Sequence, residues 1–445
     1  MTEATTDRYL ADFAQFEREI TTNGQAWTQP LRRSAITRFA ELGFPTTHHE
    51  EWKYTNVSPI TRVPFQPAPS ATNGLAAKGL ASGVIPDLVC TQLVFINGRY
   101  APELSALRGL AQGVELGSLA LALQQRPPWI EAHLARHANF EDQAFVALNT
   151  AFMCDGAYVY VPRGVVLAEP IHLIFISQQQ GEAAVSYPRN LLVLEASAQA
   201  TVIESYIGLA NDVYLTNAVT ELSLGENAVI EHCKLERESP EAFHIATLQV
   251  QQGRSSNVTS HAVTTGGALV RNTLNVVLAG EGAESTLNGL YMGTNRQLLD
   301  HQTRIDHVMP HCTSRELYKG ILDGKARGVF NGKIVVHKDA QLTDASQTNK
   351  NLLLSEDASI DTKPQLEISN NDVKCSHGST IGRLDANSVF YLRSRGLGEE
   401  DARGLLTYAF ASELIQRITL EALRTKLNDS VLTWLPSSQR LKEVR

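Results

Sequence analysis

The middle of the chain, from about residue 157 to residue 391, alternates polar and apolar residues in short runs that are typical of β-strands. The runs are separated by turns in which a Gly or an acidic residue precedes a small residue, as in 224-LGENAVIEH-232 and 354-LSEDASID-361. Some turns recur after about 28 residues, such as those at Ala228 and Ser256, and others after about half that distance. Because each turn of such a repeat buries its apolar face only against its neighbours, the pattern predicts a β-solenoid.

A β-sandwich is the alternative fold, since many short strands with turn signals between them also describe a sandwich. Thr and Asn residues such as Thr264, Thr265 and Asn272 favour the solenoid, because stacked turns accept them readily. The hexapeptide pattern of left-handed acyltransferase helices is absent from the sequence.

Helical periodicity marks both ends of the chain. Leu10 and Phe13 begin a helical pattern near the N-terminus, and further helices are predicted around residues 115–150, after a short strand at 92–100. Near the C-terminus, a run of acidic residues opens a segment over residues 398–427 with one apolar helical face. That face contains Ala402, Leu405, Leu406, Ala409 and Phe410.

These patterns of strands and helices predict a mainly β protein with three domains. Residues 1–150 form an N-terminal, mainly helical domain, residues 151–395 a parallel β-helix core, and residues 396–445 a C-terminal helical domain. The length of 445 residues is ample for this arrangement.

Composition and charge exclude several classes of protein. The net charge of −8 and the lack of a Lys/Arg cluster argue against a nucleic-acid partner. The most apolar stretch, residues 157–177, is interrupted by Arg163, Glu169 and two prolines, so we expect no membrane span. Acidic residues stand at the N-terminus where a signal peptide carries basic ones, which predicts a cytoplasmic protein.

Three familiar motifs fail on inspection. The five cysteines are scattered without a CxxC pair, so neither a disulfide framework nor a zinc site built by this chain alone is expected. Lys53 stands where the second histidine of an HExxH zinc helix belongs. The stretch 323-DGKAR-327 lacks the first glycine and the Ser/Thr of a phosphate-binding loop, so the chain has no nucleotide site of its own.

A second group of metal-ligand types lies in 300-DHQTRIDHVMPHC-312, which contains His301, His307, His311 and Cys312. Their density suggests a metal site, but their spacing matches no zinc finger or ligand pair on a helix. Polar solenoid turns also carry histidine, and this structural interpretation is the stronger one.

Cys375 and His377, in 372-DVKCSHG-378, form the main candidate site. Residues two apart on a strand point to the same face, so thiol and imidazole can be presented together. This ligand pair suits iron and iron–sulfur clusters, but two ligands cannot complete a cluster site. A buried thiol beside a hydrogen-bonded histidine remains the structural alternative, and a Cys/His hydrolase lacks an evident orienting group.

Five motifs carry a resemblance to a known family. They are HEEWKYT (49–55), ARGVFNGKIVV (326–336), DTKPQLEI (361–368), DVKCSHG (372–378) and FYLRSRG (390–396). Together they resemble the SufB/SufD family of the SUF iron–sulfur cluster assembly machinery. HEEWKYT and the CSHG form are more similar to the SufD branch than to SufB.

The resemblance implies a right-handed parallel β-helix between two helical domains. It also implies a non-catalytic scaffold subunit that pairs with SufB, binds the ATPase SufC and contributes to iron acquisition. His377 and Cys375 are then metal and cluster residues, holding a transient iron–sulfur cluster shared with SufB. ATP is used only through SufC, and a homodimer is expected when SufB is absent.

For partner contacts, the resemblance directs attention to the join between the β-helix and the last helices. The expected contact residues there are Arg393, Arg395, Leu405, Leu406, Phe410 and Glu413. Two other functions stay open from the sequence: a β-helix enzyme acting on carbohydrate, and an interaction module without metal.

Overall fold

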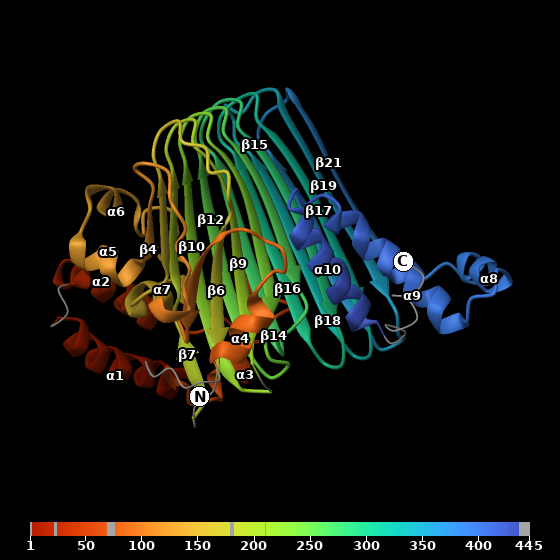
Figure 1. The fold of residues 1–445 in the computed structure, drawn as a ribbon, viewed down its shortest axis with the longest axis horizontal. Helices are drawn as coiled ribbons and strands as arrows, with labels where there is room; N and C mark the ends of the chain where they lie inside the picture. The colour runs from red at the N-terminus through yellow and green to blue at the C-terminus, as the bar shows by residue number, and fades with distance from the viewer. Residues whose placement is uncertain (1, 22–24, 69–75, 179–181, 210, 436–445) are drawn as a thin grey trace.

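Two sheets of parallel strands form the centre of the molecule in the computed structural model (Figure 1). The structure describes residues 2–21, 25–68, 76–178, 182–209 and 211–435. Sheet A contains β1 (Gln66–Pro67), β4 (Glu115–Ser118), β5 (Ala157–Val161), β7 (Ala184–Ser186), β8 (Arg189–Leu194), β10 (Tyr214–Leu224), β12 (Phe243–Gln252), β14 (Leu269–Leu278), β16 (Leu298–His307), β18 (Arg327–Val336) and β20 (Ser359–Ile368). Sheet B contains β2 (Thr91–Ile96), β3 (Arg99–Tyr100), β6 (Ile171–Ser177), β9 (Gln199–Gly208), β11 (Val229–Arg237), β13 (Asn257–Thr264), β15 (Glu284–Gly293), β17 (Thr313–Leu322), β19 (Thr343–Leu353) and β21 (Val373–Gly382).

From β8 and β9 onward, successive strands alternate between the two sheets, and each pairs with the strand two places further along the chain. The pairing is parallel throughout this region; in sheet A, for example, Ala246 of β12 lies opposite Asn272 of β14. A chain that returns to the same sheet in parallel after every turn is a solenoid. The β-solenoid prediction is therefore confirmed, and the β-sandwich alternative is wrong.

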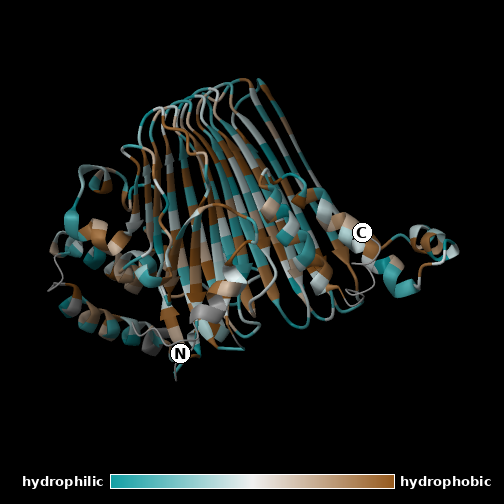
Figure 2. Ribbon diagram, in the orientation of Figure 1, coloured by the Kyte–Doolittle hydropathy of each residue, from teal (hydrophilic) through white to brown (hydrophobic). Residues whose placement is uncertain are grey.

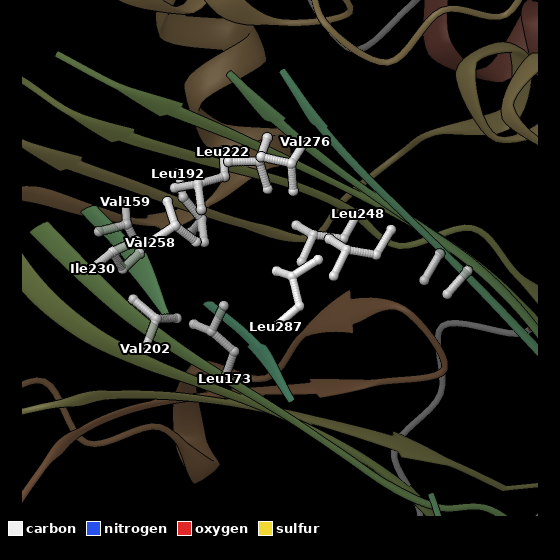
Figure 3. Close-up of a cluster of buried hydrophobic side chains, with 14 of the residues drawn as sticks. Val159, Leu173, Leu192, Val202, Leu222, Ile230, Leu248, Val258, Val276 and Leu287 are labelled. Atoms are coloured by element: carbon white, nitrogen blue, oxygen red, sulfur yellow. The ribbon is translucent and has the colours of Figure 1, made fainter. Parts of the chain in front are cut away.

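Hydrophobic and hydrophilic residues are interspersed along the strands of the two sheets (Figure 2). The inward-facing apolar residues of both sheets join in one buried cluster. The side chains that fill this interior are largely aliphatic and buried (Figure 3). Those labelled in the figure are Val159, Leu173, Leu192, Val202, Leu222, Ile230, Leu248, Val258, Val276 and Leu287. Each turn covers the apolar residues of the turn before it, as a repeat of this kind requires.

The recurring turn in the sequence has a physical cause in the stacking of the corners. Asn227 has a φ of 57°, in the left-handed region that asparagine tolerates. Its backbone N–H donates to the carbonyl of Arg254 in the next turn, at 2.8 Å. Ala228 follows and is buried inside the corner, where a larger side chain would not fit the stack. The small residue after the turn is therefore a packing requirement.

Helices cover the outer faces of the sheets. The N-terminal helices are α1 (Thr2–Thr21), η1 (Ala26–Thr28), α2 (Gln29–Leu42), η2 (Glu50–Trp52), α3 (Ser58–Thr61), α4 (Ala76–Gly83), η3 (Pro102–Leu104), α5 (Leu119–Gln125), α6 (Pro128–His133) and α7 (Ala144–Phe152). Phe39 and Phe145 from this group pack with Phe243 and Leu269 on the outside of sheet A. The predicted strand at 92–100 is confirmed as β2 and β3, and β2 joins the solenoid by pairing with β6.

The C-terminal helices are α8 (Ala386–Ser394), α9 (Glu399–Ile415) and α10 (Glu421–Trp434). Leu414 and Ile415 of α9 and Leu423 of α10 pack on Leu290 and Ile321, on the outside of sheet B. The helix expected over residues 398–427 is thus two helices. α8 projects away from the solenoid, and none of its residues is buried (Figure 1). Among the helices described, none has the length and apolar character to cross a membrane.

Candidate functional site

The last turn of the solenoid, formed by β20 and β21, is open. β20 pairs with β18 and β21 with β19, and within the described part of the chain no further strand covers either of them. Every residue of β20 and β21 is exposed or half-buried, whereas inner strands such as β16 are almost wholly buried. We call this surface of β20 and β21 the open end; uncovered strand edges of this kind are suited to pairing with another chain.

Large apolar side chains are exposed at the open end and beside it. Ile368 ends β20, Ile381 is the penultimate residue of β21, and Phe390 and Tyr391 lie on α8. Phe390 is 72% exposed, the highest value among the large apolar residues described. An apolar surface next to unpaired strand edges is characteristic of a protein interface.

Cys375 lies on β21 and points toward the interior of the last turn. It packs beside Val373 and Leu366 on a small cluster that includes Ile334 and Ala345. Burial raises the pKa of the Cys375 thiol above its ordinary value, and the nearby Asp344 carboxylate acts in the same direction. In the chain alone, this cysteine is therefore a protonated thiol and a poor metal ligand.

His377 lies two residues further along β21 and is exposed. Cys375 before it packs inward, and Ser379 after it donates to Thr362 Oγ1 on β20 at 3.0 Å. By the alternation of the strand, His377 shares their inward-facing side. The structure therefore brings Cys375 and His377 to one face at the open end, as the i, i+2 spacing predicted.

Among the residues that the structure describes, no group of three or more His, Cys, Asp and Glu side chains could hold a metal ion. Cys375 and His377 thus have no third ligand of these types from their own chain in the described ranges. A cluster at this position would need ligands from outside, which only the open side can supply.

The second sequence candidate does not come together. His301 and His307 face the interior of the solenoid, where burial lowers the pKa of each to about 4. His301 stacks on Tyr291 with ring centroids 4.8 Å apart, and His307 Nε2 lies 2.9 Å from Ser314 Oγ. His311 and Cys312 lie at a corner instead, where His311 is exposed and the Cys312 thiol donates to a backbone carbonyl. The structural interpretation of these residues is supported, and the metal interpretation is not.

Three of the expected partner-contact residues, Leu405, Phe410 and Glu413, make contacts within this chain. Lys319 Nζ of β17 donates to the Phe410 carbonyl at 2.8 Å and to Glu413 Oε2 at 2.5 Å, and lies 4.2 Å from the centre of the Phe410 ring. Phe410 and Glu413 therefore fasten α9 to sheet B within this chain. Leu405 packs toward Leu432 of α10.

The remaining contact candidates are more accessible. Leu406 is half-buried on α9. Arg393 pairs with Glu399 across 3.2 Å, and the guanidinium of Arg395 lies over the ring of Tyr391. Both arginines are exposed and have only local partners of this kind. Whether any of these residues meets a partner stays a prediction.

Sequence reasoning missed a column of polar side chains inside the solenoid. Glu316 on β17, Gln347 on β19 and His377 on β21 occupy successive register positions in sheet B. Gln347 Nε2 donates to Glu316 Oε2 at 2.7 Å, and burial raises the pKa of Glu316 to about 7. Polar residues at inward positions of predicted strands were the signal that could have revealed this column.

A cleft of about 370 Å³ on the outside of sheet A bears on the carbohydrate alternative. Asp306, which lines it, is paired with Arg304 and with His337. Beside it, Arg271 lies over the Trp52 ring, 3.8 Å from its centre, and pairs with the buried Asp300. These two acids are engaged by cations, so they are not an unpaired acid–base couple for glycoside chemistry.

Comparison with known proteins agrees with the fold and the motifs. The family model described as SUF system FeS cluster assembly, SufBD core domain, matches residues 175–410, and the SufBD protein N-terminal region matches residues 3–173. An iron–sulfur cluster assembly SufBD family protein of Synechocystis is 37% identical over 90% of this chain and 89% of its own length. The iron–sulfur cluster assembly protein SufD of Escherichia coli is 34% identical over 92% and 94%, and SufD of Bacillus subtilis is 24% identical over 94% and 95%.

Proposed function

Because the chain belongs to the SufBD family of iron–sulfur cluster assembly proteins, we propose that it is a non-catalytic scaffold subunit that pairs with SufB through its open end. One observation carries this proposal. Cys375 and His377 share a face on an uncovered edge strand, and no third ligand of the usual types reaches them among the described residues. A site that is incomplete at an interface is expected of a cluster shared between two chains.

Pairing at the open end has a simple physical basis. A strand of SufB that adds to β21 satisfies its unpaired backbone groups and buries Ile381 and Ile368. The same event brings foreign ligands within reach of His377. When SufB is absent, a second copy of this chain takes its place and gives the homodimer.

The nascent cluster is cargo that this subunit holds for a time and releases. His377, exposed at the open end, is the first residue of this chain to meet iron. Cys375 joins only after it loses its proton, since the thiolate is the ligand and burial raises the pKa of this thiol. A rearrangement of the last turn that exposes Cys375 would therefore promote cluster assembly.

SufC supplies the ATP chemistry, because this chain has no phosphate-binding loop. We place its docking surface on the C-terminal helices and the join before them. Arg393 and Arg395 are exposed and free to exchange their local partners for those of SufC. Phe410 and Glu413 support that surface from beneath through Lys319.

The test compares His377→Ala with the wild type in the complex with SufB and SufC, purified without oxygen, by its visible iron–sulfur absorption. We expect the complex to assemble and the absorption per complex to fall by about tenfold, the scale of losses around metal sites. His311→Ala is the matched control, because His311 is also an exposed histidine but lies at a corner of another turn. An intact complex with unchanged absorption in His377→Ala would instead favour a scaffold that acts by shape alone.

A further inference from the structure

The column of Glu316, Gln347 and His377 leads from the buried interior to the open end. The pairings of β17 with β19 and of β19 with β21 set Glu316 opposite Gln347 and Gln347 opposite His377. Neighbouring strands lie about 4.8 Å apart, so inward side chains at one register position stack directly on one another. Gln347 is therefore the group immediately behind His377.

The amide of Gln347 is held in one orientation. Its Nε2 donates to Glu316 Oε2 at 2.7 Å, which directs the nitrogen toward the preceding turn. Gly332 on β18 makes room for this nitrogen, since a Cβ at that position would lie 2.1 Å from it. The opposite end of the amide, Oε1, therefore points away from both β17 and Gly332.

Gln347 Oε1 is buried and has no hydrogen-bond partner among the described residues. A buried acceptor without a partner is uncommon in native proteins, because its desolvation is not compensated. The imidazole of His377 is the next polar group along the column, and it makes no hydrogen bond to any described residue in the chain alone. Two polar groups without a hydrogen-bond partner among the described residues thus lie at adjacent register positions.

We propose that Gln347 is a positioning residue for His377, with Oε1 accepting the ring N–H of the imidazole once the open end is covered. A neutral imidazole has one N–H and one nitrogen with a free lone pair. When the N–H is held inward by Gln347, the lone pair faces outward toward the shared site. Metal-ligating histidines commonly have such a partner on the second nitrogen, which fixes both tautomer and ring orientation.

Glu316 is the anchor of this arrangement. It accepts from the amide nitrogen through Oε2, so the amide cannot turn over and present its NH₂ group to the imidazole. Glutamine has the same shape but carries an NH₂ donor beside its acceptor oxygen, so Glu316→Gln permits both orientations of the Gln347 amide. Glu316→Leu removes the anchor, and we expect the orientation of Gln347 to be lost.

The role of the Gln347–His377 hydrogen bond in orienting a metal ligand rests on the proposed function. The hydrogen bond itself can be tested without iron. The full chain is labelled with ¹⁵N-histidine and observed by NMR, alone and paired with unlabelled SufB, above the pH at which imidazole titrates. His377→Ala identifies the signal, and the exposed His48 serves as internal reference. Alone, His377 should show the tautomer ratio of His48; paired, the ratio should shift by about fivefold, as one net hydrogen bond allows.

Variants separate positioning from mere packing. In the paired state, Gln347→Leu should return the His377 tautomer ratio to that of His48, and Glu316→Leu, which removes the anchor, should reduce the shift. If Gln347→Leu does not fold, Gln347→Met, with an unbranched side chain of similar length, replaces it.

Two results would overturn the inference: a paired wild type in which His377 keeps the ratio of His48, or a Gln347 variant that keeps the shift. A chain that does not pair with SufB contradicts the proposed function instead, so the two failures are distinguishable.

Discussion

The two ends of the solenoid are built from the same kind of strand but are finished differently. At the first end, the short antiparallel strands β3 and β4 end the two sheets, the neighbouring strands β2 and β5 are largely buried, and α5 and α6 cover the outside of sheet A by packing on Leu191 of β8. At the last end, the described chain leaves β20 and β21 uncovered, and α8 projects beyond them. A solenoid needs a cover at each end to protect its apolar interior. Under the proposed function, SufB supplies the missing cover at the last end.

Charged groups show the same contrast. Near the first end, Arg189 Nη2 and Glu221 Oε1 lie 2.6 Å apart with both side chains fully buried. At the last end, Arg327 and Asp361 lie at the same distance but remain partly exposed. A fully buried pair cannot lose one member without leaving a bare charge, whereas an exposed pair can exchange partners with water. The buried ion pair therefore stabilises the first end more strongly than the partly exposed ion pair stabilises the last end.

The largest loss of stability is expected from a substitution at the first end of the solenoid. Glu221 accepts from Arg189 and from the backbone N–H groups of Ala135, His137 and Ala138, which fixes the loop after α6 on sheet A. We expect Glu221→Ala to lower the free energy of unfolding by about 3 to 5 kcal/mol, because it strands the Arg189 charge. Urea denaturation followed by circular dichroism measures the change.

Asp361→Ala is the matched variant at the last end, since it removes the acid that pairs with Arg327. We expect it to cost less than about 1 kcal/mol, as partly exposed pairs usually do. Equal losses of unfolding free energy in Glu221→Ala and Asp361→Ala would contradict the claim that the buried ion pair stabilises the fold more than the partly exposed one.

A smaller effect is expected at Glu316, on β17 close to the last end. Burial raises the pKa of this carboxyl to about 7 in the folded chain, against 4.5 for the ordinary group. Its stabilising contribution is therefore complete below about pH 4.5 and is lost as the pH rises through about 7. We expect the free energy of unfolding of the wild type to fall by about 2 to 3 kcal/mol more than that of Glu316→Gln between pH 5 and pH 8.

Urea titrations of both proteins across this pH range test the prediction. Glu281→Gln is the control, because it makes the same substitution at an exposed corner of the solenoid. Parallel curves for the wild type and Glu316→Gln would mean that Glu316 ionises as readily in the folded chain as in the unfolded one.

The sequence could predict the repeated turns of the solenoid but not which turn is left uncovered. The solenoid was predictable because its turn chemistry is local: a left-handed residue followed by a small buried one recurs at several corners, as at Ser197–Ala198, Asn227–Ala228 and Ser255–Ser256. Strand alternation likewise placed Cys375 and His377 on one face. The exposure of that face was not predictable from local pattern, because it depends on which strand is last in the whole stack.

Long-range partners account for the residues that the sequence could not place. Phe410, on the apolar face of the predicted helix, and Glu413 were expected partner contacts, but within this chain they meet Lys319, more than ninety residues away in the sequence. The bond between Glu316 and Gln347 spans 31 positions and depends on the strand register. Apolar periodicity predicts the face of an element but not the neighbour that it meets.

The smallest expected effect on stability is at Ile381, in the open end. This side chain is 52% exposed, so Ile381→Ser should change the free energy of unfolding of the isolated chain by less than about 0.5 kcal/mol. If SufB covers the open end, the same change should weaken pairing by about tenfold, because an apolar contact at the interface is lost. Val166→Ser is the matched control, since Val166 is 58% exposed in the first turn and should affect neither property. Binding isotherms with SufB decide the matter: equal weakening by both variants, or none by Ile381→Ser, would place the interface elsewhere.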